Sequence, residues 1–162
     1  MSRRSGARHR LPARVKLLRV IDANANRARE GLRVSEDLLR LAYDEPALFR
    51  RLRALRHGVT RLLRQLPVGQ AELIDARDTR TDSGRRAGFA GVASLHHLLL
   101  LNLQRAKEAL RVLEETSRVL DPRRRTAAGF QRLRFDLYDA ERDILLRLAA
   151  LRHPRPRSRR QP

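Results

Sequence analysis

The chain has no cysteine, which excludes disulfide bonds and thiolate metal sites. Tryptophan is also absent, and the two tyrosines and four phenylalanines are too few for a surface that stacks nucleic-acid bases. No apolar run exceeds four residues, as at 98–101, so none can cross a bilayer. The N-terminal stretch MSRRSGARHRLPA is basic but lacks the apolar region of a signal peptide. We therefore expect a cytoplasmic protein.

The usual signatures of nucleotide and metal sites are missing as well. The sequence contains no GxxxxGK[ST] phosphate loop, no GxGxxG turn after a strand and no HExxH pair. His96 and His97 are adjacent, so a helix would point them about 100° apart and away from a shared ion. Any nucleotide chemistry in this chain must therefore use a fold other than the standard phosphate-loop fold.

The formal net charge of +19 invites a nucleic-acid interpretation. Residues 1–14 and 152–162, however, supply +10 of it through five arginines each, and they contain no acids. We expect both segments to be disordered tails that bind nucleic acid only non-specifically. A non-enzymatic helical protein that binds nucleic acid remains an alternative at this point.

The remaining residues, 15–151, carry a helical pattern of apolar residues. Between residues 15 and 43 the apolar side chains recur at steps of three and four. The sequence DEP at 44–46 ends this helix and begins a second one, which runs to about Leu66. Ser94 is a candidate N-cap for a third helix to Leu120, and a fourth helix ends near Leu151. We predict an all-α fold, a single antiparallel helical bundle.

One long segment, residues 67–93, has no sustained periodicity and is predicted to be a loop. It contains the sequence ARDTRTDSG at 76–84, rich in carboxylate, hydroxyl and guanidinium groups. Carboxylate and hydroxyl oxygens suit magnesium, and arginine suits phosphate. The same residue types are ordinary in turns, so the composition leaves a plain turn equally open.

The chain also repeats itself. Asn24–Asp37 and Asn102–Glu115 share eight identities in fourteen positions, and the FRRLR of Phe49–Arg53 matches the FQRLR of Phe130–Arg134 if the second half holds three extra residues. A hairpin of two helices cannot bury its apolar face alone. We predict two duplicated helical hairpins, residues 15–66 and 94–151, packed into one core and joined by the long loop.

The repeated charges allow three interpretations. Ladders such as Arg27–Glu30 and Arg105–Glu108 commonly stabilise a solvent-exposed helix face. On a helical wheel, however, both pairs fall within a second apolar sector, opposite the main stripe. That position predicts partial burial, either as structural ion pairs or around a cavity between the halves. The same wheel places the outer charged residues, Glu36 among them, on a face that we expect to be exposed and linked by salt bridges.

These motifs together resemble one known family. The segments are RVIDANANRAREGLRVSED, ARDTRTDSG, NLQRAKEALRVLEE and LRFDLYDAE, in this order along residues 17–150. They are similar to the monofunctional hydroxymethylpyrimidine-phosphate kinase family of thiamin biosynthesis. Its helical domain is often fused in front of thiamine phosphate synthase, and here we expect a free-standing version.

The resemblance implies an activity and a set of residues. The activity is transfer of the ATP γ-phosphoryl group to 4-amino-5-hydroxymethyl-2-methylpyrimidine phosphate, with Mg²⁺, in functional association with thiamine phosphate synthase. A catalytically inactive partner of that synthase is an open alternative. In the active version, arginines bind phosphates, glutamates hold them, asparagines read the pyrimidine or a phosphate, and aspartates hold magnesium. The expected catalytic residues are Arg27, Arg77, Arg105, Glu30 and Glu108; the expected substrate-binding residues are Asn24, Asn102, Thr79 and Gly84; the expected metal ligands are Asp78 and Asp82.

Overall fold

The computed structural model describes residues 12–80, 82 and 91–152, and the described residues form helices without any strand. The helices are α1 (Ala13–Leu41), α2 (Pro46–Leu63), α3 (Gln70–Asp75), α4 (Leu95–Leu120) and α5 (Arg125–Arg152). The all-α prediction and the four long helices are confirmed. The predicted tails lie almost wholly outside the described residues, as does Gly84.

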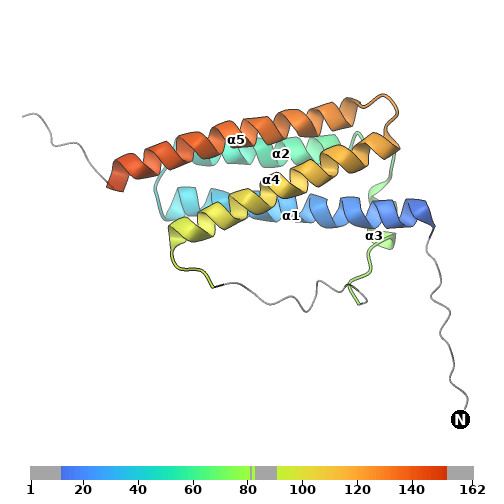
Figure 1. Cartoon of the computed structure of the whole chain (residues 1–162), viewed down its shortest axis with the longest axis horizontal. Helices are drawn as coiled ribbons and strands as arrows, with labels where there is room; N and C mark the ends of the chain where they lie inside the picture. The colour runs from blue at the N-terminus through green and yellow to red at the C-terminus, as the bar shows by residue number, and fades with distance from the viewer. Residues whose placement is uncertain (1–11, 81, 83–90, 153–162) are drawn as a thin grey trace, which may run out of the picture.

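The four long helices form a bundle in which each helix packs against two others. α1 contacts α2 and α4, and α5 contacts the same two helices from the opposite side (Figure 1). Within each half the two helices are antiparallel, which agrees with the predicted pair of hairpins. Figure 1 also shows that α2 ends at the end of the bundle opposite to the start of α4. The connection between the halves must therefore return along the length of the bundle, and this explains why it is long.

The helix boundaries follow local chemistry. Ser94 caps α4, because its Oγ accepts a hydrogen bond of 3.0 Å from the backbone N–H of His97. Asp121 begins α5 in a similar way, accepting 3.0 and 2.8 Å bonds from the N–H and hydroxyl of Thr126. These bonds, the backbone bond first, lower the pKa of Asp121. Pro46 opens α2, as predicted from its fixed φ angle.

The short helix α3 was not predicted. It lies inside the segment 67–93, which we expected to be a loop throughout. Gly69 precedes it, and the backbone N–H of Gly69 donates a 3.0 Å bond to Oε1 of Glu72. The other carboxylate oxygen of Glu72 accepts a 3.0 Å bond from Arg14 at the start of α1. A six-residue helix has little stability of its own, so contacts with distant parts of the chain hold it in place.

Two buried ion pairs show how the halves correspond. Glu36 is fully buried and binds Nε and Nη2 of Arg56 at 2.6 and 3.2 Å. In the second half Glu114 binds Nε of Arg134 at 2.9 Å. In both halves the arginine follows the glutamate by twenty residues. The halves thus align without an insertion, and the predicted match of FRRLR with FQRLR, shifted by three residues, was wrong.

The same pairs correct the assignment of inward and outward charges. We expected Glu36 to lie on the salt-bridged surface, but it is one of the most buried residues of the protein. It lies one turn from Leu32 and from Leu39, which belong to the core stripe, so its carboxylate reaches the space between α1 and α2. Hydrogen bonding to Glu36 is the main cause that raises the pKa of Arg56, so the guanidinium remains charged.

Gly31 allows the two halves to pack closely together. A Cβ atom at this position would lie 2.7 Å from the backbone carbonyl oxygen of Asn102, so α1 and α4 approach here at backbone contact. One turn later Ser35 replaces an aliphatic residue of the repeat, and its buried hydroxyl donates a 2.9 Å bond to the Gly31 carbonyl. Small residues at this crossing let the two halves share one core.

We predict that Gly31→Ala destabilises the protein by about 2 kcal/mol, because a backbone atom cannot yield to the added methyl group. Gly129→Ala is the matched control. It gains the same helix propensity, and the nearest atoms to its new methyl group belong to the flexible side chain of Leu62. Urea unfolding followed by circular dichroism measures both variants. Equal free energies of unfolding would contradict the close backbone contact.

Candidate anion site on the face of α1

Arg77 connects α1 to the linker, which is the name we give to the segment 67–93 between the two halves. Its Nε and Nη2 donate to the two carboxylate oxygens of Asp22, both at 2.7 Å. The Asp22 side chain is 10% exposed, whereas that of Arg77 is 43% exposed. The hydrogen bond to Asp22 raises the pKa of Arg77. This bidentate pair fixes residues 76–78 against the middle of the bundle's first helix.

The residue after Arg77 contacts the neighbouring face of α1. Nη2 of Arg19 lies 3.5 Å from the backbone oxygen of Asp78 and 3.7 Å from its carboxylate. The same carboxylate accepts a 3.1 Å bond from the backbone N–H of Arg80. Thr79, between them, is exposed. The segment therefore crosses α1 with Arg77 on one side and Asp78 on the other.

On the Asp78 side, the surface of α1 is hollowed. The hollow has a volume of about 370 Å³ and is lined by Lys16, Arg19, Val20, Ala23, Asn24, Arg27 and Asp82. It unites three of the residues predicted from sequence, Asn24, Arg27 and Asp82, with two basic residues that were not predicted. Three cationic groups beside one carboxylate suit a phosphate with its counter-ion.

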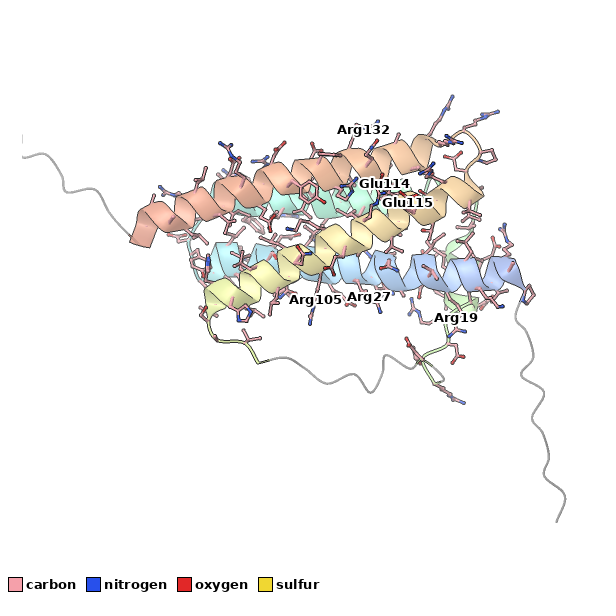
Figure 2. All side chains as sticks on the ribbon, in the orientation of Figure 1. Arg19, Arg27, Arg105, Glu114, Glu115 and Arg132 are labelled. Atoms are coloured by element: carbon pink, nitrogen blue, oxygen red, sulfur yellow. The ribbon has the colours of Figure 1, made fainter. Side chains whose placement is uncertain are left out.

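Arg27 and Arg105 lie at corresponding positions of the two halves and point to the same side of the molecule (Figure 2). The prediction that they are partly buried with their glutamates was wrong. Arg27, Glu30, Arg105 and Glu108 are all exposed, and neither arginine pairs with its glutamate among the described residues. Glu108 instead accepts a 2.8 Å bond from Gln104.

The physical reason is that, among the described residues, no helix covers most of the second apolar sector of α1. Val20 and Val34, which belong to that sector, are 41% and 36% exposed. The helical wheel gave the angular position of each side chain correctly, but α4 packs on the main stripe and, in the second sector, on Gly31. The predicted cavity between the halves is thus an open face, and its two arginines are accessible to a ligand.

Asn24 and Asn102 are buried and equivalent. In each, Nδ2 donates a 2.8 Å bond to the backbone oxygen four residues earlier, on Val20 and Leu98 respectively. Only about 7% and 6% of these residues is exposed. Each amide therefore uses a donor inside its own helix, and the burial of both side chains gives little support to a role in reading a pyrimidine ring.

The sequence matches a known family. The model of the ThiD2 family matches residues 19–143, which include α2, α3, α4, the linker and most of α1 and α5. The chain belongs to the ThiD2 family.

Curated relatives of this ThiD2 chain carry the name thiamine-phosphate synthase. The protein from Synechococcus sp. (strain CC9605) is 40% identical over 78% of this chain and 34% of its own length. The proteins from Synechocystis sp. (strain ATCC 27184 / PCC 6803 / Kazusa) and Rhodopirellula baltica (strain DSM 10527 / NCIMB 13988 / SH1) are 38% and 34% identical, covering 80% and 83% of this chain and 36% of each relative. The chain spans about a third of the length of the curated relatives it matches. No solved structure matches.

The ThiD2 chain offers a magnesium ion few protein ligands. Among residues 12–80, 82 and 91–152, no three carboxylate or imidazole groups gather at one point. Asp78 and Asp82 lie on the same segment beside the basic hollow. Mg²⁺ is commonly bound by one or two carboxylates together with substrate phosphates, so this donor set fits an ion that arrives with its nucleotide. In the same described part of the chain, no helix is long and apolar enough to span a membrane.

Asp22, Arg19 and Lys16 are the residues that sequence reasoning missed. Asp22 is the most informative, because it is an acid on the apolar stripe between Ile21 and Ala25. A lone acid at such a position requires a partner, and the arginine of the linker motif was the candidate. Arg19 and Lys16 lie one and two turns before Ala23, so a helical wheel centred on Arg27 would have placed them on the same face.

Proposed function

We propose that this chain is a phosphotransferase of thiamine biosynthesis. Its reaction would be the transfer of the γ-phosphoryl group of ATP to 4-amino-5-hydroxymethyl-2-methylpyrimidine phosphate. The observation that carries the proposal is the basic hollow on α1, where Arg19 and Arg27 lie beside Asp82. The pathway follows from the name of its relatives, which also supports a functional association with thiamine-phosphate synthase.

In the proposed reaction an oxygen of the acceptor monophosphate attacks the γ-phosphorus of ATP. A new P–O bond forms, the bond from the γ-phosphorus to the β–γ bridging oxygen breaks, and ADP leaves with that oxygen. The acceptor is already an anion at neutral pH, so no general base is needed. Two anions must approach each other, and the enzyme's main task is positioning and charge neutralisation.

The accessible basic residues suit this task. Arg27 and Arg105 would bind phosphate oxygens from α1 and α4, and Arg19 and Lys16 would extend the positive surface along α1. Glu30 and Glu108 flank the two arginines and would orient them. Asp78 and Asp82 would hold Mg²⁺ together with the phosphates, and the ion would neutralise charge that develops on the phosphoryl oxygens.

In this proposal the linker also contributes residues to the site, opposite the face of α1. Arg77 is held by Asp22, so in this proposal its first duty is to fix the linker, and its exposed edge faces the phosphates. Thr79 would add a hydroxyl donor from the same segment. Gly84, which we expected to contact substrate, lies outside the described residues.

The test is a direct assay of the full chain with the pyrimidine monophosphate, ATP and Mg²⁺. We expect the pyrimidine diphosphate and ADP to form in equal amounts, measured by anion-exchange chromatography, and we expect EDTA to stop the reaction. An assay without acceptor controls for ATP hydrolysis. The proposal fails if no diphosphate forms under conditions in which an established pyrimidine-phosphate kinase converts the same substrates.

A further inference from the structure

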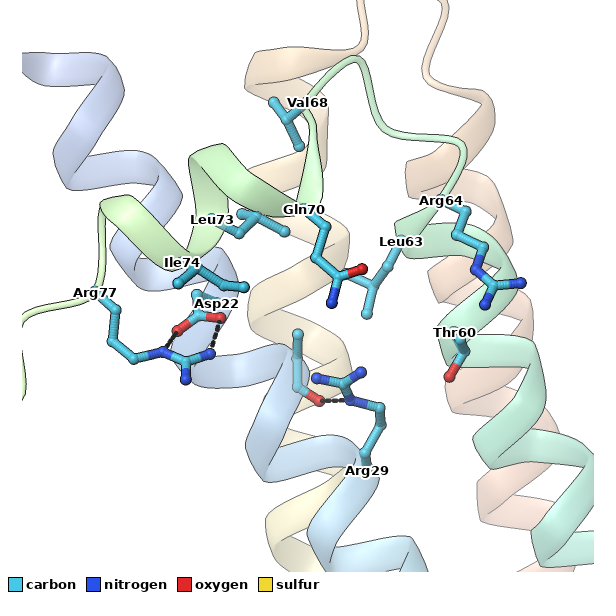
Figure 3. A pocket seen from close by; sticks show the side chains of 11 residues that line it. Asp22, Arg29, Thr60, Leu63, Arg64, Val68, Gln70, Leu73, Ile74 and Arg77 are labelled. Carbon is cyan, nitrogen blue, oxygen red and sulfur yellow. Dashed lines mark hydrogen bonds and ion pairs between the residues drawn. The ribbon is translucent and has the colours of Figure 1, made fainter.

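A second hollow lies on the other side of the Asp22–Arg77 pair, between α1, α2 and the short helix α3 (Figure 3). Its volume is about 520 Å³, larger than the hollow beside Asp82. Apolar side chains from three elements line it, namely Leu63, Val68, Leu73 and Ile74. Ile74 is 51% exposed although it faces this space. A water-filled hollow with an exposed isoleucine on its wall would gain free energy by taking up an apolar ring.

The hollow is held open by contacts at both ends of α3. Glu72 bonds Arg14 of α1 and the backbone of Gly69, and Arg77 follows α3 and bonds Asp22. These bonds hold α3 against α1, and a space is left between α3 and α2. A pre-formed site of this kind binds a small molecule with little cost of ordering.

Two polar side chains point into this space in Figure 3, the amide of Gln70 and the guanidinium of Arg29. The preceding turn of α1 holds Arg29 in place: Arg29 donates to the backbone oxygen of Ala25 at 3.2 Å and to Oδ1 of Asn26 at 2.6 Å. Among the described residues no carboxylate pairs with it. Arg64, directly after α2, stands on the rim, and Asp22 is already neutralised by Arg77. The hollow therefore has a positive rim that suits a phosphate.

The Gln70 amide offers a donor and an acceptor side by side. This pair is complementary to the edge of a 4-aminopyrimidine, where an amino group adjoins a ring nitrogen, and glutamine reads the same pattern on adenine. We propose that this hollow binds the ring of a phosphorylated aminopyrimidine compound between its apolar walls, with Gln70 reading the amino edge and Arg29 attracting the phosphate. This inference rests on the proposed function, and it moves ring recognition away from Asn24 and Asn102.

The position of the hollow connects it to the phosphate-binding face. Asp22 lines this second hollow, and the next residue, Ala23, lines the basic hollow. In the same way Arg77 lines the second hollow, and the next residue, Asp78, contacts Arg19 of the basic hollow. The two hollows are thus neighbours, separated by the Asp22–Arg77 pair. Both the acceptor pyrimidine and the adenine of ATP carry the required edge, and binding experiments distinguish them.

The experiment measures ligand binding to the full chain by isothermal titration calorimetry. The probes are the pyrimidine monophosphate, ADP with Mg²⁺, and UMP, whose ring lacks the amino edge. For the ligand that occupies the hollow, Gln70→Ala should raise Kd about tenfold, and Arg29→Met should do the same through the phosphate. Gln131→Ala removes an exposed amide of α5 that does not line the hollow; it is the matched control and should leave every Kd unchanged. Far-ultraviolet circular dichroism confirms that each variant is folded.

The outcomes separate this inference from the proposed function. A rise in Kd for the pyrimidine alone assigns the hollow to the acceptor, and a rise for ADP alone assigns it to the donor. If Gln70→Ala and Arg29→Met leave the affinities for both unchanged, or if Gln70→Ala weakens UMP as much as it weakens the aminopyrimidine ligands, the inference is overturned even where turnover is normal. If the variants weaken binding but the wild-type chain never forms the diphosphate, the hollow stands and the proposed function falls.

Discussion

Arg27→Ala and Arg105→Ala are each expected to lower kcat/KM for diphosphate formation at least about a hundredfold. Removing one preorganised cation that contacts the transferring phosphoryl group typically has an effect of this size. Both side chains are exposed, and neither forms an ion pair with another described residue, so their removal should leave the fold intact. The effect should therefore appear in the rate while the melting temperature stays within about 2 °C of the wild type, as for ordinary surface substitutions.

Arg33→Ala is the matched control. Arg33 is exposed on α1, as Arg27 is, and among the described residues it pairs only with Asp37, at 3.1 Å and away from the basic hollow. Its loss changes the net charge equally, so a general electrostatic effect would lower the rate of all three variants alike. Asp78→Ala extends the test to the linker and should also abolish turnover. Near-normal rates in Arg27→Ala and Asp78→Ala together would show that the reaction takes place elsewhere on the molecule.

The helices and their hairpins could be predicted because their signals are local. The apolar period, the capping hydroxyl of Ser94 and the proline at 46 each act within one or two turns, and each appears where the sequence placed it. The duplication also predicted one long-range feature, namely that the two halves share a core. Repeated identities predict this because a single hairpin leaves an apolar face exposed.

The site was harder to predict because its geometry depends on contacts between distant segments. α3 is stabilised by bonds to Arg14 and, through Arg77, to Asp22, residues more than fifty positions away in sequence. No local pattern encodes such contacts. The helical wheel likewise gives each side chain a direction, but it does not say which directions another helix will cover. That is why Arg27 was expected inside and Glu36 outside, when the structure has them the other way round.

The repeated sequence also contained the signal for the two buried ion pairs, although the structure was needed to recognise it. Glu36 and Glu114 are identical in the repeat, and an arginine follows each by twenty residues, at positions 56 and 134. Twenty residues are enough for one helix end, a turn and the start of the next helix. A glutamate and an arginine repeated at this spacing predict a pair between antiparallel helices. The shifted alignment of the aromatic residues concealed it.

The Glu114–Arg134 pair is expected to dominate the response of the fold to mutation. Glu114→Ala should lower the free energy of unfolding by about 3 kcal/mol or more, because it leaves the guanidinium of Arg134 buried without its counter-charge. The side chains are only 7% and 10% exposed, so water cannot take the place of the carboxylate. The hydroxyl of Tyr138, 3.2 Å from Nη1 of Arg134, supplies a hydrogen bond but no charge. Chemical denaturation at neutral pH measures the difference.

Two further variants separate the buried charge from the loss of a side chain. Glu115→Ala removes an exposed carboxylate next in sequence, which pairs with Arg111 and Arg118, and should cost less than about 1 kcal/mol. In Glu114→Leu combined with Arg134→Met, both charges are replaced by apolar groups of similar volume. Most of the lost stability should then return, since the desolvation of both ions disappears with their attraction. If the double variant is as unstable as Glu114→Ala, packing at this position decides stability, and the unpaired guanidinium does not.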